Sequence, residues 1–129
     1  MGAGKIAAQC GHATLGAYKH AMKRNAGDVK SWSRTGQAKI ALKCPTLEEM
    51  HAIADNAEKA GIINYTVVDA GRTQIEEGTE TVLAIGPVSF CFCLFHYYND
   101  KRMFDLGIGV KGRHRQTNWT FEVAVNGNK

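Results

Sequence analysis

Residues that could catalyse a hydrolysis gather on one short stretch of the chain, residues 69–81. Asp69, Arg72 and Thr73 lie on or beside a polar loop, and Thr81 follows at its far end. A carboxylate, a cation and hydroxyl groups at the end of a strand can together position a water molecule. The alternative is an ordinary loop, in which Asp69 caps nearby backbone N–H groups and Arg72 is solvated.

A second candidate lies near the start of the chain, where Gly2-Ala3-Gly4-Lys5 precedes a predicted helix. Free backbone N–H groups at a helix start can hold an anion, and Lys5 adds positive charge. The spacing and the Ser/Thr of a phosphate-binding P-loop are absent, so a tight turn is the simpler interpretation. His12 follows Lys5 by about two helical turns, which puts both on one face. It is a candidate base or RNA contact, and a packed, hydrogen-bonded histidine is the alternative.

The periodicity of residues 5–24 predicts a long helix that carries Lys5 and His12. Its apolar face is rich in small residues, so its backbone can approach a sheet closely. The rest of the chain alternates helical and strand patterns. We first expect a short helix that is capped by Asp28 and runs through Trp32, followed by a strand at 37–43. A second helix is expected from Thr46 to about Ala60, with Thr46 and Glu49 as its capping box and Gly61 as its stop. Two further strands are expected at 62–69 and 80–86.

This alternation predicts an α/β fold, a mixed β-sheet flanked by helices in a single small domain. Asp69 falls at the end of the strand at 62–69. In open α/β sheets, ligands usually bind at the carboxyl ends of strands. The fold class therefore places the loop that begins at Asp69 where a functional site is expected.

Composition narrows the classes of function. The chain has 129 residues, of which 44% are hydrophobic and 22% charged, as in a soluble globular domain. Its net charge of +4 permits an acidic partner such as RNA without requiring one. The spacings of the four cysteines match no zinc pattern, so we expect reduced, buried thiols. We recognise no secretory signal or membrane-spanning stretch, and therefore expect a cytoplasmic protein without a membrane partner. Association with mitochondria and formation of a homodimer stay open.

The two segments contain two long motifs. They are Gly4-Lys5-Ile6-Ala7-Ala8-Gln9-Cys10-Gly11-His12-Ala13, and Asp69-Ala70-Gly71-Arg72-Thr73-Gln74-Ile75 followed by Gly78, Thr81 and Ile85-Gly86-Pro87. These motifs, with Trp32, Gly36-Gln37 and Lys39-Ile40 between them, resemble in sequence and order the peptidyl-tRNA hydrolase family of the archaeal and eukaryotic type. The resemblance covers nearly all of residues 1–87.

The resemblance implies hydrolysis of the ester that joins a peptide to the terminal ribose of tRNA, with peptidyl-tRNA as the partner and no metal or organic cofactor. The family's proposed catalytic residues fall on Lys5, Asp69, Thr73 and Thr81. We expect Asp69 to orient the attacking water, and Lys5 to stabilise the oxyanion or bind a tRNA phosphate. The residues expected to contact the RNA or the substrate are Gln9, His12, Lys19, Lys23, Arg34, Arg72 and Gln74.

Two departures from the family pattern weigh on activity. Family members begin with a strand before the glycine turn, but here Met1 aligns within that turn, and loss of an interior strand would expose two sheet edges. After Pro87 the pattern ends, as in an alternative transcript with an internal start and a read-through end. We therefore divide the chain into a hydrolase-like domain, residues 1–87, and an atypical, poorly packed tail, residues 88–129. Within the tail, residues 119–125 alternate like a strand that could pair with an exposed edge. The competing interpretation is an inactive chain that keeps only RNA or protein binding.

Overall fold

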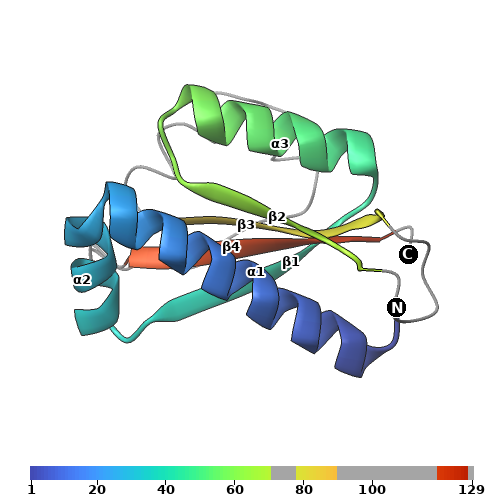
Figure 1. The fold of residues 1–129 in the computed structure, drawn as a ribbon, viewed down its shortest axis with the longest axis horizontal. Helices are drawn as coiled ribbons and strands as arrows, with labels where there is room; N and C mark the ends of the chain where they lie inside the picture. The colour runs from blue at the N-terminus through green and yellow to red at the C-terminus, as the bar shows by residue number, and fades with distance from the viewer. Residues whose placement is uncertain (71–77, 90–118, 128–129) are drawn as a thin grey trace, which may run out of the picture.

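A computed structural model describes residues 1–70, 78–89 and 119–127 of the chain. Helices and strands alternate over most of this length, as the sequence pattern predicts (Figure 1). In chain order the elements are α1 (Ala3–Arg24), α2 (Ala26–Arg34), β1 (Ala38–Cys44), α3 (Leu47–Lys59), β2 (Asn64–Val68), β3 (Glu80–Ser89) and β4 (Trp119–Asn126).

The four strands form one mixed sheet in the order β1-β4-β3-β2. β4 runs parallel to β1 and antiparallel to β3, and β2 pairs antiparallel with β3. The helices cover both faces: α1 and α2 lie on one side of the sheet and α3 lies on the other (Figure 1). The predicted class, a mixed α/β sheet flanked by helices, is confirmed.

Each face of the sheet has its own apolar cluster. Under α1 and α2 the cluster joins small helix residues to strand valines and Trp32; its buried members are Ala13, Ala17, Trp32, Val67, Val82, Ala84 and Val123. Under α3 the buried members are Cys44, Met50, Ala57, Ile62, Leu83, Ile85, Val88 and Ala124. Adjacent residues of β3 and β4 alternate between the two clusters, as the period of two in a strand requires.

β4 is an interior strand, so the part of the tail that forms it, Trp119–Asn126, is packed into the sheet. Val123 and Ala124 are 2% and 7% exposed, and each belongs to one of the two core clusters. Pairing with β1 on one side and β3 on the other satisfies backbone groups that two open edges would leave unpaired. Strand pairing at residues 119–125 is thus confirmed, whereas the division into domains at Pro87 stays a prediction.

Local signals in the sequence explain where several elements begin and end. Thr46 caps α3, because its hydroxyl oxygen accepts a hydrogen bond from the Glu49 backbone N–H at 3.2 Å. Gly61 follows α3 with a φ of 71°, a left-handed conformation that glycine adopts without strain. Asp28 does not cap α2 as expected: it lies inside the first turn, and the Asn25 amide donates to its carboxylate instead.

β3 also runs further than expected. The sequence predicted a strand that ends at Gly86, but the strand continues through Pro87 to Ser89. Proline has no N–H to donate to a neighbouring strand. The register of β3 against β4 shifts between Ile85 and Val88, so regular pairing is interrupted at this point. Pro87 therefore lies at an irregularity where the ladder does not need its hydrogen bond.

Candidate active site

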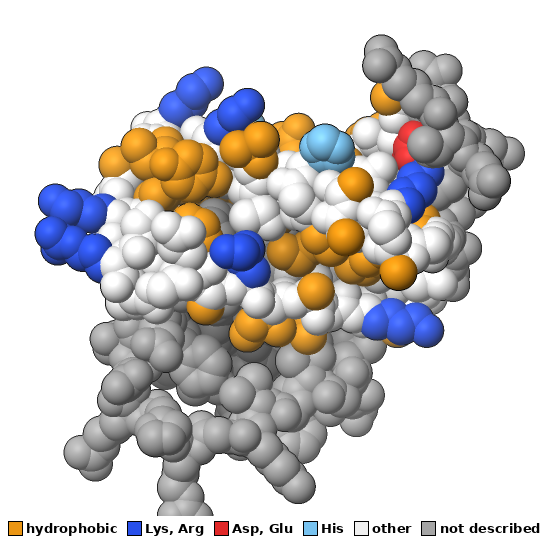
Figure 2. Space-filling view, turned by 90° about the horizontal axis from the view of Figure 1, so that it is seen from below, with side chains coloured by type: hydrophobic (Ala, Val, Ile, Leu, Met, Phe, Trp, Pro, Cys, Tyr) orange, Lys and Arg blue, Asp and Glu red, His pale blue; other side chains and the backbone are white. Residues whose placement is uncertain are grey.

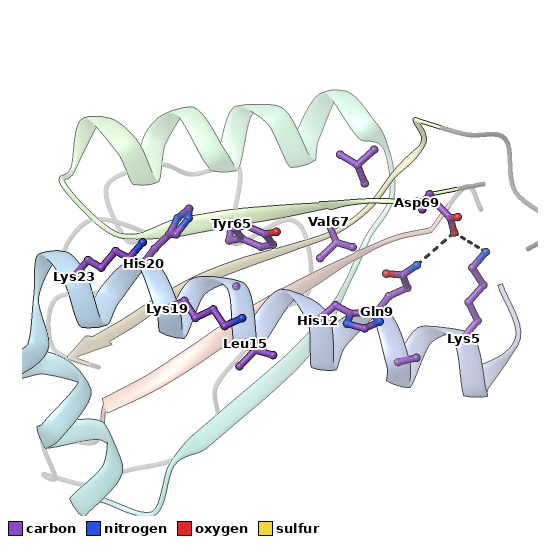
Figure 3. A pocket seen from close by; sticks show the side chains of 14 residues that line it. Lys5, Gln9, His12, Leu15, Lys19, His20, Lys23, Tyr65, Val67 and Asp69 are labelled. Carbon is purple, nitrogen blue, oxygen red and sulfur yellow. Dashed lines mark hydrogen bonds and ion pairs between the residues drawn. The ribbon is translucent and has the colours of Figure 1, made fainter. Parts of the chain in front are cut away.

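A groove of 790 Å³ lies between α1 and β2 and contains most of the described candidate residues. α1 contributes side chains at helical spacing, among them Lys5, Gln9, His12 and Lys19, so a single face of the helix forms one wall. β2 and the two residues after it, Asp69 and Ala70, form the other wall. Figure 3 shows these side chains along α1, with Tyr65, Val67 and Asp69 on the strand side of the groove.

Lys5 and Gln9 converge on one oxygen of Asp69 (Figure 3). The Lys5 Nζ lies 2.7 Å from Asp69 Oδ2, and the Gln9 Nε2 donates to the same oxygen at 3.3 Å. The Asp69 side chain is only 5% exposed and that of Lys5 is 19% exposed, so this ion pair is largely withdrawn from water. A charged hydrogen bond in such surroundings is stronger than one on the surface.

The local structure holds Asp69 at this end of the groove. Its backbone N–H donates to the Thr79 carbonyl at 2.8 Å, and its own carbonyl accepts from the Gly78 N–H at 3.0 Å. These bonds extend the pairing of β2 with β3 beyond Val68. The carboxylate is therefore presented by a fixed backbone, which favours a precise geometry.

Small residues let α1 approach the sheet. Ala13, Ala17 and Ala21 are fully buried where α1 faces the strands. At Gly16 a Cβ atom would lie 2.3 Å from the ring of Tyr65, so glycine is required for this close approach. The expectation that the small-residue face of this helix packs closely on a sheet is confirmed.

The other candidates fall into three groups. His12, Lys19 and Lys23 line the groove with Lys5 and Gln9, and Arg34 does not, because it lies on α2. Thr81 is fully buried and donates its hydroxyl to the Val67 carbonyl at 3.3 Å; it does not line the groove. Thr73, Arg72 and Gln74 lie outside the described residues.

Sequence reasoning missed two aromatic residues in the groove. His20 and Tyr65 meet edge to face, with 5.2 Å between their ring centroids. The signal for His20 was available, because it follows Gln9 by three helical turns and therefore lies on the same face. The signal for Tyr65 was not, because its strand pattern does not say which helix covers it.

Among the described residues, the groove is lined by more basic than acidic side chains. Lys5, Lys19 and Lys23 line it, and Asp69 is its one carboxylate within the described part of the chain. Figure 2 shows a face of the molecule on which acidic side chains are scarce, with Lys and Arg side chains at both ends and a histidine between them. A groove with this balance attracts anions.

Gln9 has one further feature. Its Nε2 is used by Asp69, but its buried Oε1 accepts no hydrogen bond from the described residues. A buried acceptor without a donor is costly, and such groups concentrate at functional sites.

Residues 1–70, 78–89 and 119–127 contain no group of three or more His, Cys, Asp or Glu side chains that could hold a metal ion. Over the same residues, no helix combines the length and the apolar character needed to cross a bilayer.

Comparison with known proteins places the chain in a family. The family model described as Peptidyl-tRNA hydrolase PTH2 matches residues 1–90, more than half of the chain. The chain therefore belongs to this family, as its two motifs indicated. The match includes α1, the groove and β3, whereas β4 lies outside it.

Relatives from animals and from Methanopyrus kandleri carry the name of the same family. The chain is 46% identical over 87 residues to human "Peptidyl-tRNA hydrolase 2, mitochondrial", and 47% identical over 89 residues to "Probable peptidyl-tRNA hydrolase 2" of Drosophila melanogaster. These alignments cover 67% and 69% of the chain, and 49% and 48% of the relatives. With "Peptidyl-tRNA hydrolase" of the archaeon Methanopyrus kandleri it shares 45% identity over 84 residues, which is 65% of the chain and 72% of that protein. The chain thus spans about half the length of the two animal relatives.

Proposed function

We propose that this chain hydrolyses the ester bond of peptidyl-tRNA, releasing the peptide and the tRNA. The observation that carries this proposal is the buried ion pair of Lys5 with Asp69, held by Gln9 at the end of a basic groove. The names of the relatives support the same activity. The groove supplies a cationic surface for the RNA, and the ion pair supplies the groups that an ester hydrolysis needs.

In this proposal Asp69 orients the attacking water. A cation 2.7 Å away favours the charged form of the carboxylate, and it also makes the carboxylate a weaker base. Asp69 therefore positions the water by accepting its hydrogen bond and need not remove a proton completely. Gln9 helps by holding the carboxylate in a fixed orientation through its Nε2.

Lys5 stabilises the transition state. As water attacks the ester carbonyl, negative charge develops on the carbonyl oxygen, and a lysine ammonium has three N–H donors to offer. Lys5 contacts Asp69 and brings its positive charge to the end of the groove where this oxygen forms in the proposal. Thr73 and Thr81 stay candidates from the family resemblance; for Thr81, the bond to Val67 favours a role in holding β2 beside β3.

Hydrolysis of N-acetyl-aminoacyl-tRNA by the purified chain tests the proposal. We expect release of tRNA, and a fall in rate of about 10²- to 10⁴-fold for Asp69→Asn and for Lys5→Met. Asp55→Asn and Lys59→Met change the same residue types on α3, across the sheet, and should leave the rate unchanged. Folded wild-type protein that binds tRNA but releases none would refute the proposal and leave an RNA-binding chain.

We further propose that the activity serves translation quality control in the cytoplasm, because release from peptidyl-tRNA returns the tRNA to use. Mitochondria are the alternative location, because the name of the human relative places that protein there. Fluorescence microscopy of a tagged chain separates the two locations, and sedimentation would establish whether it forms a homodimer.

A further inference from the structure

We infer that a nucleobase from the single-stranded 3′ end of tRNA stacks on the aromatic pair formed by His20 and Tyr65. The inference rests on the proposed function, because it assigns the nucleotide part of the same substrate to a second point in the groove. Both residues line the groove, and neither belongs to the Lys5–Gln9–Asp69 cluster.

The geometry of the pair suits a flat ligand. The two rings meet edge to face, so they present planes of different orientation to the groove. Tyr65 is half-buried and fixed, since its ring lies against Gly16 and packs on the core beneath α1. His20 is exposed, so its ring is accessible to a ligand. A rigid aromatic surface stacks any base, because every base has a π face.

The charges around the pair favour RNA over a peptide. Lys19 and Lys23 lie on α1 on either side of His20 in sequence and line the same groove (Figure 3). Aromatic rings between cations are the usual composition of single-strand binding sites, in which the cations follow the phosphates and the rings take the bases. Within the described residues, the one carboxylate of the groove is Asp69, at the opposite end and paired with Lys5.

The position of the pair gives the substrate a direction. Lys5 and His20 are separated by fifteen residues of α1, about 22 Å along its axis. With the ester at Lys5 and Asp69, the terminal nucleotides extend along α1 toward its C-terminus, and a base a few nucleotides from the ester reaches His20. The peptide then leaves from the other side of the ester.

Binding of two labelled RNA probes tests this assignment. One probe is a short single-stranded RNA ending in CCA, and the other has the same phosphates but abasic sugars. We expect His20→Ala and Tyr65→Leu to weaken binding of the first probe about tenfold and to leave the second unchanged. Lys19→Gln and Lys23→Gln should weaken both probes and lower the salt dependence by about one unit each.

Controls separate stacking from damage to the fold. His51→Ala removes a histidine from α3, on the other face, and should affect neither probe. Because His20 is exposed, His20→Ala keeps the core intact, so its result stands even if Tyr65→Leu unfolds. Equal loss for both probes, or no loss for either, contradicts the inference. So does an N-blocked peptide that binds the wild type but not His20→Ala, because it assigns this part of the groove to the peptide.

The outcomes also separate this inference from the proposed function. Base-dependent binding without hydrolysis would sustain the stacking site and refute the enzyme. Hydrolysis together with probe binding that ignores His20 and Tyr65 would sustain the enzyme and refute the stacking site.

Discussion

The two faces of the sheet are packed by different means. α1 meets the strands through buried alanines and Gly16, whereas α3 meets them through Met50 and larger aliphatic side chains. Small residues bury less apolar surface, but they bring the helix backbone close enough for Lys5 and Gln9 to reach Asp69. A larger side chain such as Met50 buries more apolar surface than an alanine does. The face with the candidate site thus gains proximity between the helix backbone and the strands.

The largest effect on stability is expected from α3. Met50 is 1% exposed and one of the largest fully buried side chains. Met50→Ala removes its apolar atoms and leaves a cavity, which costs roughly 2–5 kcal/mol of the free energy of unfolding. Urea denaturation measures this as a lower midpoint with an unchanged slope. A midpoint equal to that of the wild type would mean that the α3 face contributes little.

A matched pair of substitutions tests whether hydrolysis depends on the close packing of α1, and not of α3, against the sheet. Ala17 is fully buried on α1 and Ala57 is 4% exposed on α3. Ala17→Leu and Ala57→Leu each overpack their cluster, at a cost of about 1–3 kcal/mol. Only Ala17→Leu should also reduce tRNA hydrolysis, because it moves α1, with Lys5, away from Asp69. Equal activity of the two folded variants would contradict the proposed importance of this approach.

The N-terminal caps of α1 and α3 are expected to affect stability less than the core substitutions do. Thr46 caps α3 with a side-chain hydrogen bond, whereas Gly2 precedes α1 and makes none. Thr46→Ala should cost about 1 kcal/mol in the free energy of unfolding, and Gly2→Ser should add a few tenths. The serine side chain has room, since a Cβ atom at Gly2 meets nothing within 4 Å. Thermal unfolding followed by circular dichroism measures both changes, and a stabilising Thr46→Ala would disprove the cap.

The smallest effect concerns Asp28, in the first turn of α2. Desolvation raises the pKa of its carboxyl group, and the hydrogen bond from Asn25 partly lowers it. The folded state therefore holds this proton more tightly than the unfolded state, so stability falls slightly as pH rises from the ordinary carboxyl pKa through the raised one. Asp28→Asn should remove this slope from pH-dependent unfolding. In an NMR titration, Asn25→Ala should raise the pKa of Asp28 further, and a lower pKa would contradict the assignment.

Local signals made much of the fold predictable from the sequence. Apolar periodicity identified α1, and Thr46 with Gly61 gave the limits of α3. The predicted face of α1 included Ala13 and Ala17, which are buried, and Met22, which is 46% exposed. The motif residues Lys5 and Asp69 were correctly expected to meet, although they are far apart in the chain. In that case the family resemblance supplied the long-range information that periodicity lacks.

Long-range packing explains what could not be predicted. An alternating pattern at residues 119–125 indicates a strand, but alternation does not say which strands it will join, and β4 pairs with both β1 and β3. Tyr65 gave no sign of its place beside Gly16 and His20, because that contact depends on how α1 crosses the sheet. Thr81 was expected in the site from its place beside the polar loop and in the motif, and its hydroxyl bonds to the backbone of the neighbouring strand.

The interior position of β4 has a consequence for the order of folding. Ala38 pairs with Thr120, and Val88 pairs with the same residue across a connection of residues 90–118. Contacts between such distant residues form late, because a long loop must close before any of them contributes stability. Until then β1 and β3 each keep an edge that can pair with another chain. Refolding of this protein is therefore a competition between two rates: insertion of β4, which does not depend on protein concentration, and association of chains, which rises with it.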